Sequence, residues 1–432
     1  MKKIFFIFLL VIFYSKNVFA VTLKEALLIA YKNNPTLNAE RENLSISRED
    51  INIAKSDFLP SITLSGSKSE EDTTKLTNSD GSRASLAEVN PEVKTVLIEQ
   101  TIFQGFGGIA DLKKNKLGLD ISEAKLLKVE QEILYLAVDA YTGLILSNKK
   151  FKINQSNVSL LERQVETDQS RLEKGQISLA DLAQSESSLA GANAKFIESK
   201  NKLITSKLNY ENIIGPIDNF DDLKEKSSIN YKLPENLMKA NKISKKNNPE
   251  LIIAKLELEQ SEKDVQIAKS ELSPSATLSF ESSETDDYSS TYQELDKETL
   301  QATITWPIFS GGKNSATLKK NKNLNNQKKL LLDNTIKENN TNVASAWSNF
   351  QYSKSFLNSV KSQVKAAEIA NEGITVEYES GLGRSTLDVI QSNAFLLESK
   401  ISLANSERNY LLSQFKLLQS VGLLTSKYLQ IN

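Results

Sequence analysis

The sequence predicts an α+β membrane protein with an internal two-fold repeat, made of long coiled-coil-like helices and four β-strands per chain. Three repeated patterns carry this prediction. The motifs NNP, IAKS and Pro-Ser occur around Pro35 and again around Pro249 at one constant offset. The sequence IFQG at Ile102 is matched by IFSG at Ile308, and KGQISLADLAQS by SGLGRSTLDVIQS further along. A duplication of this length requires a fold with pseudo-symmetry.

The first twenty residues, MKKIFFIFLLVIFYSKNVFA, have the pattern of a secretory signal peptide. Lys2 and Lys3 precede an apolar run of about 11 residues, and Val18 and Ala20 fit the small-residue cleavage pattern. A membrane anchor is the alternative, but this run is shorter than the ~20 residues that a spanning helix needs. We therefore expect the mature chain to begin at Val21.

The composition argues against several kinds of chemistry. The chain has no Cys, so it folds without disulfide bonds, and it has no His, the commonest general base and metal ligand. Acidic residues number 54 and basic residues 53, a balance that does not suggest nucleic-acid binding. We expect no catalytic residues, no metal site and no cofactor.

Two very long helical segments are expected, and each is followed by a returning helix. The first runs over about 109–172 without Pro, is interrupted at Gly175 and returns to about 214. The second runs over about 316–378, is interrupted at Gly381 and Gly383 and returns to 421. In the first long helix, apolar residues recur at the seven-residue spacing typical of coiled coils: Leu112, Leu119, Leu126, Ile133 and Ala140.

Strands are expected over about 61–74, 93–103, 275–285 and 298–308. The last of these alternates between an apolar and a polar face, and the apolar face holds Leu300, Ala302, Ile304, Trp306 and Ile308. Such strands are long enough to cross an outer membrane when tilted. Packing on a soluble core is the alternative, but no surplus apolar segment is present to cover this face.

These elements define the expected organisation of the chain. A signal peptide (1–20) precedes a first repeat (21–215) that ends in a helical hairpin over about 109–214. A mixed segment (216–236) connects it to a second repeat (237–432), whose hairpin covers about 314–421.

Four strands are too few to close a transmembrane barrel, and an open sheet edge in lipid leaves backbone groups unsatisfied. Several chains must therefore share one barrel. Three chains supply twelve strands, and their helices can form a matching ring. A dimer supplies eight strands, but its narrow bore would be filled by side chains.

The chain resembles the TolC family of outer membrane efflux proteins. The resemblance rests on the two NNP-centred helices, the IFQG and IFSG junctions, and the hairpin tips that end in Asp181 and Asp388. It covers essentially the whole mature chain. It implies a homotrimer in the outer membrane with a helical barrel across the periplasm. It also implies docking to an inner-membrane pump, ABC or proton-driven, through a periplasmic adaptor protein.

The resemblance also implies a periplasmic gate at the hairpin tips around Gly175, Gly381 and Gly383. In the family, polar links between helices hold this mouth closed and acidic rings line it. The matching residues are Asp181, Tyr378, Arg384 and Asp388, while a second family Asp is replaced by Gln391. Ordinary solvated helix starts would also carry Asp in the first turn. We expect Arg384→Ser combined with Asp181→Ala to loosen the mouth.

Trp306 lies near the end of the predicted strand, on its apolar face. This position indicates an aromatic residue at the membrane interface. The function that this interpretation implies is a channel-tunnel that exports small molecules or type I secreted proteins. A periplasmic coiled-coil scaffold or adaptor without a pore is the alternative, although it would not need a lipid-facing strand pattern. The sequence does not identify the cargo.

Overall fold

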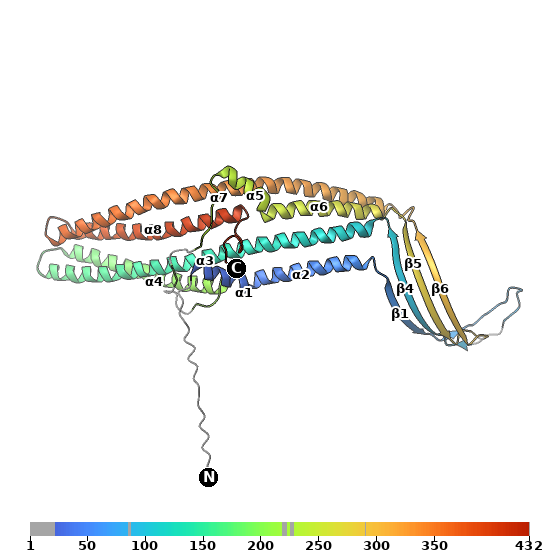
Figure 1. The fold of residues 1–432 in the computed structure, drawn as a ribbon. Coiled ribbons are helices and arrows are strands. Elements are labelled where there is room, and N and C mark those ends of the chain that lie inside the picture. The colour runs from blue at the N-terminus through green and yellow to red at the C-terminus, as the bar shows by residue number, and fades with distance from the viewer. Residues whose placement is uncertain (1–21, 85–87, 218–222, 225–228, 290, 432) are drawn as a thin grey trace, which may run out of the picture. The chain divides into compact units, whose positions relative to one another are not determined.

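The computed structural model describes residues 22–84, 88–217, 223–224, 229–289 and 291–431. The predicted signal peptide and its cleavage point at Val21 lie outside these ranges. None of the described helices is long and apolar enough to cross a membrane. The helices, shown in Figure 1, are α1 (Leu23–Asn33), α2 (Pro35–Ser56), α3 (Gly107–Glu173), α4 (Leu179–Ile213), α5 (Leu237–Asn247), α6 (Pro249–Ser270), α7 (Lys313–Glu379) and α8 (Thr386–Ser420).

Four strands form one antiparallel sheet in the order β1-β4-β5-β6. They are β1 (Ser61–Lys68), β4 (Glu92–Gln104), β5 (Ser275–Asp286) and β6 (Glu294–Thr305). Each repeat contributes one hairpin, and β4 pairs with β5 to join the two hairpins into a single sheet (Figure 1). A short ladder of β2 (Glu71–Asp72) and β3 (Glu88–Val89) extends beyond the first hairpin.

Two strands differ from their predicted limits. The strand predicted over 298–308 is β6, which begins at Glu294 and ends at Thr305. Pro307 has no N–H to donate to a ladder, so pairing stops before it. The strand predicted over 61–74 ends at Lys68, and a separate short strand follows. Backbone pairing does not require apolar side chains, which is why β6 extends into a polar sequence.

The register of the sheet gathers apolar side chains on one face. Ile62 of β1 pairs with Ile98 of β4, which pairs with Phe280 of β5, which pairs with Leu300 of β6. In the single chain this face is open: Ile62 and Leu300 are each 71% exposed, and Ile304 is 76% exposed. Exposed apolar rows of this kind require a covering partner or lipid.

The chain divides into two compact units, and each takes segments from both sequence repeats. One unit contains the chain up to Leu37 with 130–244 and 342–432, and so holds both helical hairpins. The other contains 38–129 and 245–341, and so holds the sheet. The long helices α3 and α7 contribute to both units.

Within the first unit, the two repeats form equivalent cores. Val343, Ala346 and Phe350 of α7 pack with Ala240 of α5 and Leu417 of α8. One repeat earlier, Ala137, Ala140 and Leu144 of α3 are buried at the matching positions, as are Ala26 of α1 and Tyr210 of α4. Matching buried positions are what a duplicated unit with pseudo-symmetry requires.

Candidate functional site

The site is formed by the two turns where each long helix reverses direction. Figure 1 shows α4 running back along α3, and α8 running back along α7. The predicted tip glycines Gly175, Gly381 and Gly383 have φ values of 65°, 74° and 82°. Only glycine adopts this left-handed region without steric cost, so these residues allow the sharp reversal.

Asp181 and Asp388 begin the returning helices in identical ways. Each forms a capping box: the backbone N–H of Ser178 donates to Asp181 Oδ2 at 2.9 Å, and that of Ser385 donates to Asp388 Oδ2 at 2.9 Å. The hydrogen bonds from Ser178 and Ser385 lower the pKa values of the two carboxyl groups below their usual range. Both groups therefore stay ionised close to solvent, where they can attract cations.

Arg384 lies in the second tip and pairs with Glu377 of the same hairpin, with 2.6 Å between Nε and Oε2. Its hydrogen bond to Glu377 and the charge of that residue raise its pKa, and Asp388 adds to the effect. Among the described residues, Asp181 hydrogen-bonds only to Ser178 of its own hairpin. The exposed Gln391 lies one turn beyond Asp388. The structure therefore does not join Arg384 to Asp181 within one chain.

Tyr378 has a different environment, because its hydroxyl group is buried between the two hairpins. It donates to Asp168 Oδ1 at 3.0 Å and lies 3.1 Å from Thr386 Oγ1. The guanidinium group of Arg171 covers the Tyr378 ring at 4.2 Å from its centroid. Asp168 and Arg171 belong to α3 and Tyr378 to α7, so this contact connects the first hairpin to the second.

Asp168 is fully buried, with 0% of its surface exposed. Its carboxyl group accepts hydrogen bonds from Ser185 Oγ at 2.5 Å and Gln164 Nε2 at 3.0 Å, in addition to the bond from Tyr378. A buried carboxyl group is tolerated only when its oxygens are satisfied in this way. This group is the centre of the polar contact between the hairpins.

Asp168 was absent from the site residues predicted from the sequence, although the sequence contains a signal for it. The seven-residue series that includes Ile133 and Ala140 continues along α3 through buried positions to Asp168. These positions are Ser147, Asn154 and Leu161. A charged residue at the core position of a coiled-coil pattern marks a specific polar contact.

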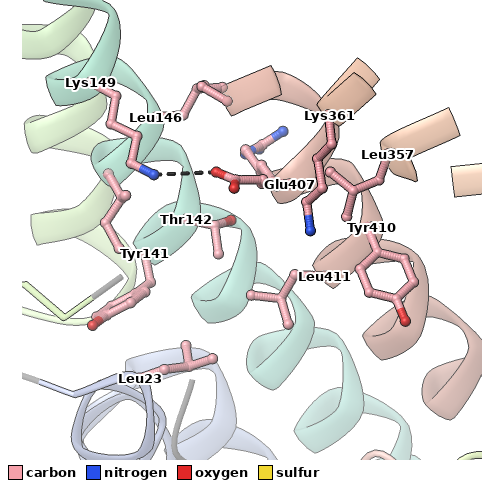
Figure 2. Close-up of a pocket in the computed structure, with 13 residues that line it drawn as sticks. Leu23, Tyr141, Thr142, Leu146, Lys149, Leu357, Lys361, Glu407, Tyr410 and Leu411 are labelled. Carbon is pink, nitrogen blue, oxygen red and sulfur yellow. Dashed lines mark hydrogen bonds and ion pairs between the residues drawn. The ribbon is translucent and has the colours of Figure 1, made fainter. Parts of the chain in front are cut away.

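A second group of charged residues connects the hairpins further from the tips (Figure 2). Lys149 of α3 pairs with Glu407 of α8 at 3.3 Å, as the dashed line in Figure 2 shows, and Arg408 Nη2 lies 2.5 Å from Asp139 Oδ1. Lys149, Glu407 and Arg408 border a cavity of about 370 Å³ that is also lined by Lys361. The hairpins are thus held by polar contacts at two levels, and the one at the tips is centred on Asp168.

Trp306, the predicted interface residue, lies in the other unit and beyond the end of β6. Its side chain is 60% exposed, and its Nε1 donates to the backbone oxygen of Leu272 at 3.2 Å. Ile308 and Phe309 follow it and are 78% and 86% exposed. The end of β6 therefore presents a group of exposed apolar side chains just before α7 begins.

The fold and the paired hairpins are those of an outer membrane channel protein. The model of the outer membrane efflux protein family matches residues 27–216 and 242–423, so both repeats match and the chain belongs to this family. The predicted family resemblance is thereby confirmed. The chain is an outer membrane channel that extends into the periplasm, of the kind that serves efflux or type I secretion.

Individual relatives agree with this assignment. The chain is 25% identical to the outer membrane efflux protein BepC of Brucella suis, over 94% of this chain and 87% of BepC. It is 21% identical to the alkaline protease secretion protein AprF of Pseudomonas aeruginosa, over 100% of this chain and 90% of AprF. The structure matches the CmeC outer membrane channel of Campylobacter jejuni with a TM-score of 0.81 and 16% identity, covering 93% of this chain and 85% of CmeC.

Proposed function

We propose that three copies of this chain form one continuous export tunnel, with a shared twelve-stranded barrel in the outer membrane. The observation that carries the proposal is the four-stranded sheet, whose edge strands β1 and β6 have no further partner in the described chain. In lipid, each unpaired backbone group at such an edge costs several kcal/mol. Pairing β1 of one copy with β6 of the next removes both edges, and three copies close the ring.

The apolar face of the sheet supports the same arrangement. The row from Ile62 to Leu300 and the exposed Ile304 require a hydrophobic covering. Lipid supplies this covering around the outside of a barrel, whereas a soluble scaffold would leave these side chains in water. A soluble periplasmic scaffold would therefore not explain why this face of the sheet is apolar.

We infer that the hairpin tips form the periplasmic gate of this tunnel. The contact between Tyr378 and Asp168 holds the two hairpins of one chain together, so opening at the tips requires this contact to change. Threefold symmetry would bring three Asp388 carboxylates together as a ring that attracts cations. Because Arg384 is held by Glu377 within its hairpin, its role in closure would depend on contacts between copies.

The partners of the tunnel follow from the same proposal. A periplasmic adaptor protein and an inner-membrane pump, ABC or proton-driven, would load the cargo at the hairpin tips. The relatives carry names from both efflux and protein secretion, so both small molecules and secreted proteins are candidate cargo. The pump and the adaptor would determine which of them is exported.

Crosslinking of the edge strands tests the shared barrel, and the absence of native Cys makes the background clean. Thr63 lies on β1, and Thr299, Gln301 and Thr303 lie on the corresponding polar face of β6. We expect one pairing of Thr63→Cys with a β6 cysteine to give covalent trimers on a non-reducing gel. Each single variant serves as the control. Monomers throughout the series, in protein recovered from outer membranes, would contradict a barrel shared by β1–β6 pairing.

A further inference from the structure

The strand-to-helix junction of the second repeat carries only positive charges. Residues 299–332 contain six Lys and no acidic residue or Arg. They run from the apolar part of β6 through the first five turns of α7. The chain as a whole is balanced between acidic and basic residues, so the charge of this segment differs from that of the whole chain.

The same basic sequence occurs in both repeats at the same place. The pentapeptide LKKNK begins at the sixth residue of α3 and again at the sixth residue of α7, at Leu112 and Leu318. Elsewhere the two long helices differ, for instance where Leu119 of the first copy is matched by the buried Asn325. The position of this basic segment relative to the sheet is therefore a shared feature of the two copies.

Several of these lysines are available to a partner. We define the basic patch as Lys113, Lys116, Lys319, Lys320 and Lys322, all of which are exposed. None of them forms an ion pair with another described residue, whereas Lys114 pairs with Asp264 and Lys328 pairs with Glu257 on α6. Because α6 contacts both long helices through these pairs, it lies between the two halves of the patch.

The depth of the patch suits the headgroup layer of a bilayer. At 1.5 Å per residue, Lys319 lies about 9 Å and Lys322 about 14 Å beyond the start of α7. The exposed Ile308 and Phe309 lie directly before that start. A headgroup layer is roughly 5–8 Å thick, and lysine side chains can extend toward it along an apolar surface.

We propose that the basic patch binds the phosphate groups of anionic phospholipids in the periplasmic leaflet of the outer membrane. This inference rests on the proposed function, because it requires the sheet to lie in that membrane. Apolar side chains at the strand ends contact the acyl region, and the adjacent lysines contact the phosphates. In a trimer the LKKNK sequence occurs six times around the tunnel, because each chain contributes two copies. The patch fixes the depth at which the channel sits.

Retention of lipid by the purified protein tests this proposal. Three proteins are compared: the wild type, a control, and a patch variant that combines Lys319→Gln, Lys320→Gln and Lys322→Gln. Each is washed in detergent that contains phosphatidylglycerol and phosphatidylcholine at equal concentrations. The control changes three exposed lysines further along the same helix, Lys337→Gln, Lys354→Gln and Lys365→Gln. Mass spectrometry of the retained lipid then gives the preference for phosphatidylglycerol.

We expect the wild type and the control to prefer phosphatidylglycerol, and the patch variant to lose this preference by about tenfold or more, since each lysine near an anionic surface contributes about fivefold. Raising salt from about 0.1 M to about 1 M should reduce the wild-type preference, because the Debye length falls from ~10 Å to ~3 Å. Equal retention by all three proteins would overturn the proposal. The proposal would also be overturned if the patch variant retained lipid like the wild type but shifted the reversal potential in planar bilayers. That result would place the lysines in the tunnel lumen.

The mass of the detergent-solubilised wild-type protein is measured first. If the wild type is not a trimer, the proposed tunnel fails before the patch is tested. If it is a trimer and its lipid preference does not depend on the patch, only the lipid inference fails.

Discussion

Asp168 is the residue at which the two helical hairpins meet near their tips. Its buried carboxyl group accepts hydrogen bonds from Gln164 and Ser185 of its own hairpin and from Tyr378 of the other. A hydrogen bond to a buried charged group contributes about 1.5–3 kcal/mol, more than an ordinary exposed bond. The contact therefore stabilises the observed arrangement of the two hairpins, and opening of the proposed gate would have to break it.

Removing the Tyr378 hydroxyl group tests this role. We expect Tyr378→Phe to loosen the tips, because the buried carboxyl group of Asp168 loses a hydrogen-bond donor. A hydrogen bond to a charged group contributes about 1.5–3 kcal/mol. Single-channel conductance in planar bilayers should rise, or open events should become more frequent. Tyr352→Phe is the matched control, since Tyr352 lies on the same helix with 62% exposure. Identical conductance for both variants and the wild type would exclude Tyr378 from the gate.

The capping carboxylate Asp388 makes the tip sensitive to acid. Hydrogen bonds from Ser385 lower its pKa below the ordinary value of 3.8, so its contribution is present above that value and is lost as the pH falls through the lowered pKa. We expect hydrogen exchange in the first turn of α8 to be slower in the wild type than in Asp388→Asn near pH 7. The difference should begin to shrink as the pH falls toward about 4 and should vanish only below the lowered pKa of Asp388. A difference that persists unchanged in strong acid would contradict this account.

At the scale of the elements, the tip glycines set the conformation of the hairpins. Gly383 has φ 82°, and a Cβ atom there would meet no atom within 4 Å, so only backbone strain opposes a side chain. We expect Gly383→Ala to destabilise the protein by about 1–2 kcal/mol. Gly373→Ala is the control: Gly373 lies within α7 with open space around it, and Ala there should stabilise by about 0.5–1 kcal/mol. The midpoints of thermal unfolding of the detergent-solubilised proteins compare the two, and equal shifts would contradict the strain argument.

The sequence allowed the type and order of the long elements to be predicted, because their periodicity extends over many residues. The limits of the strands were less accurate, since β6 continues through polar residues that pair only through the backbone and then stops before Pro307. The positions of Asp181 and Asp388 at the starts of the returning helices follow from local sequence, whereas their proposed role in a gate came from the family resemblance. Asp168 does not, because its importance depends on Tyr378, which is far away in the sequence.

The packing of the returning helices on small side chains could not be predicted from the pattern of apolar residues in the sequence. The returning helices bury small residues, five serines and one alanine, at seven-residue spacing: Ser185, Ala192 and Ser199 in α4, and Ser399, Ser406 and Ser413 in α8. Ser406 and Ser413 hydrogen-bond to backbone oxygens of their own helix, which satisfies their hydroxyl groups. Small side chains allow a neighbouring helix to approach closely, so these stripes contribute to packing without contributing to hydrophobicity.

At the scale of the whole molecule, duplication of the sequence and division into compact units are separate properties. Each repeat contributes one hairpin to the sheet and one helical hairpin to the other unit, so neither repeat is a compact unit by itself. Among the residues that the structure describes, the sheet still has two open edges after both repeats have contributed. The proposed tunnel therefore completes its barrel by association of chains, which is the central claim of this account.

The detergent-corrected mass of the mature protein extracted from outer membranes tests that claim most directly. Analytical ultracentrifugation or light scattering would give the mass of the protein without its bound detergent. The account predicts a stable trimer, because only closure of the ring removes the edges of β1 and β6. A monomer found in the water-soluble fraction, with no protein in the outer membrane, would contradict the shared barrel and favour a periplasmic scaffold.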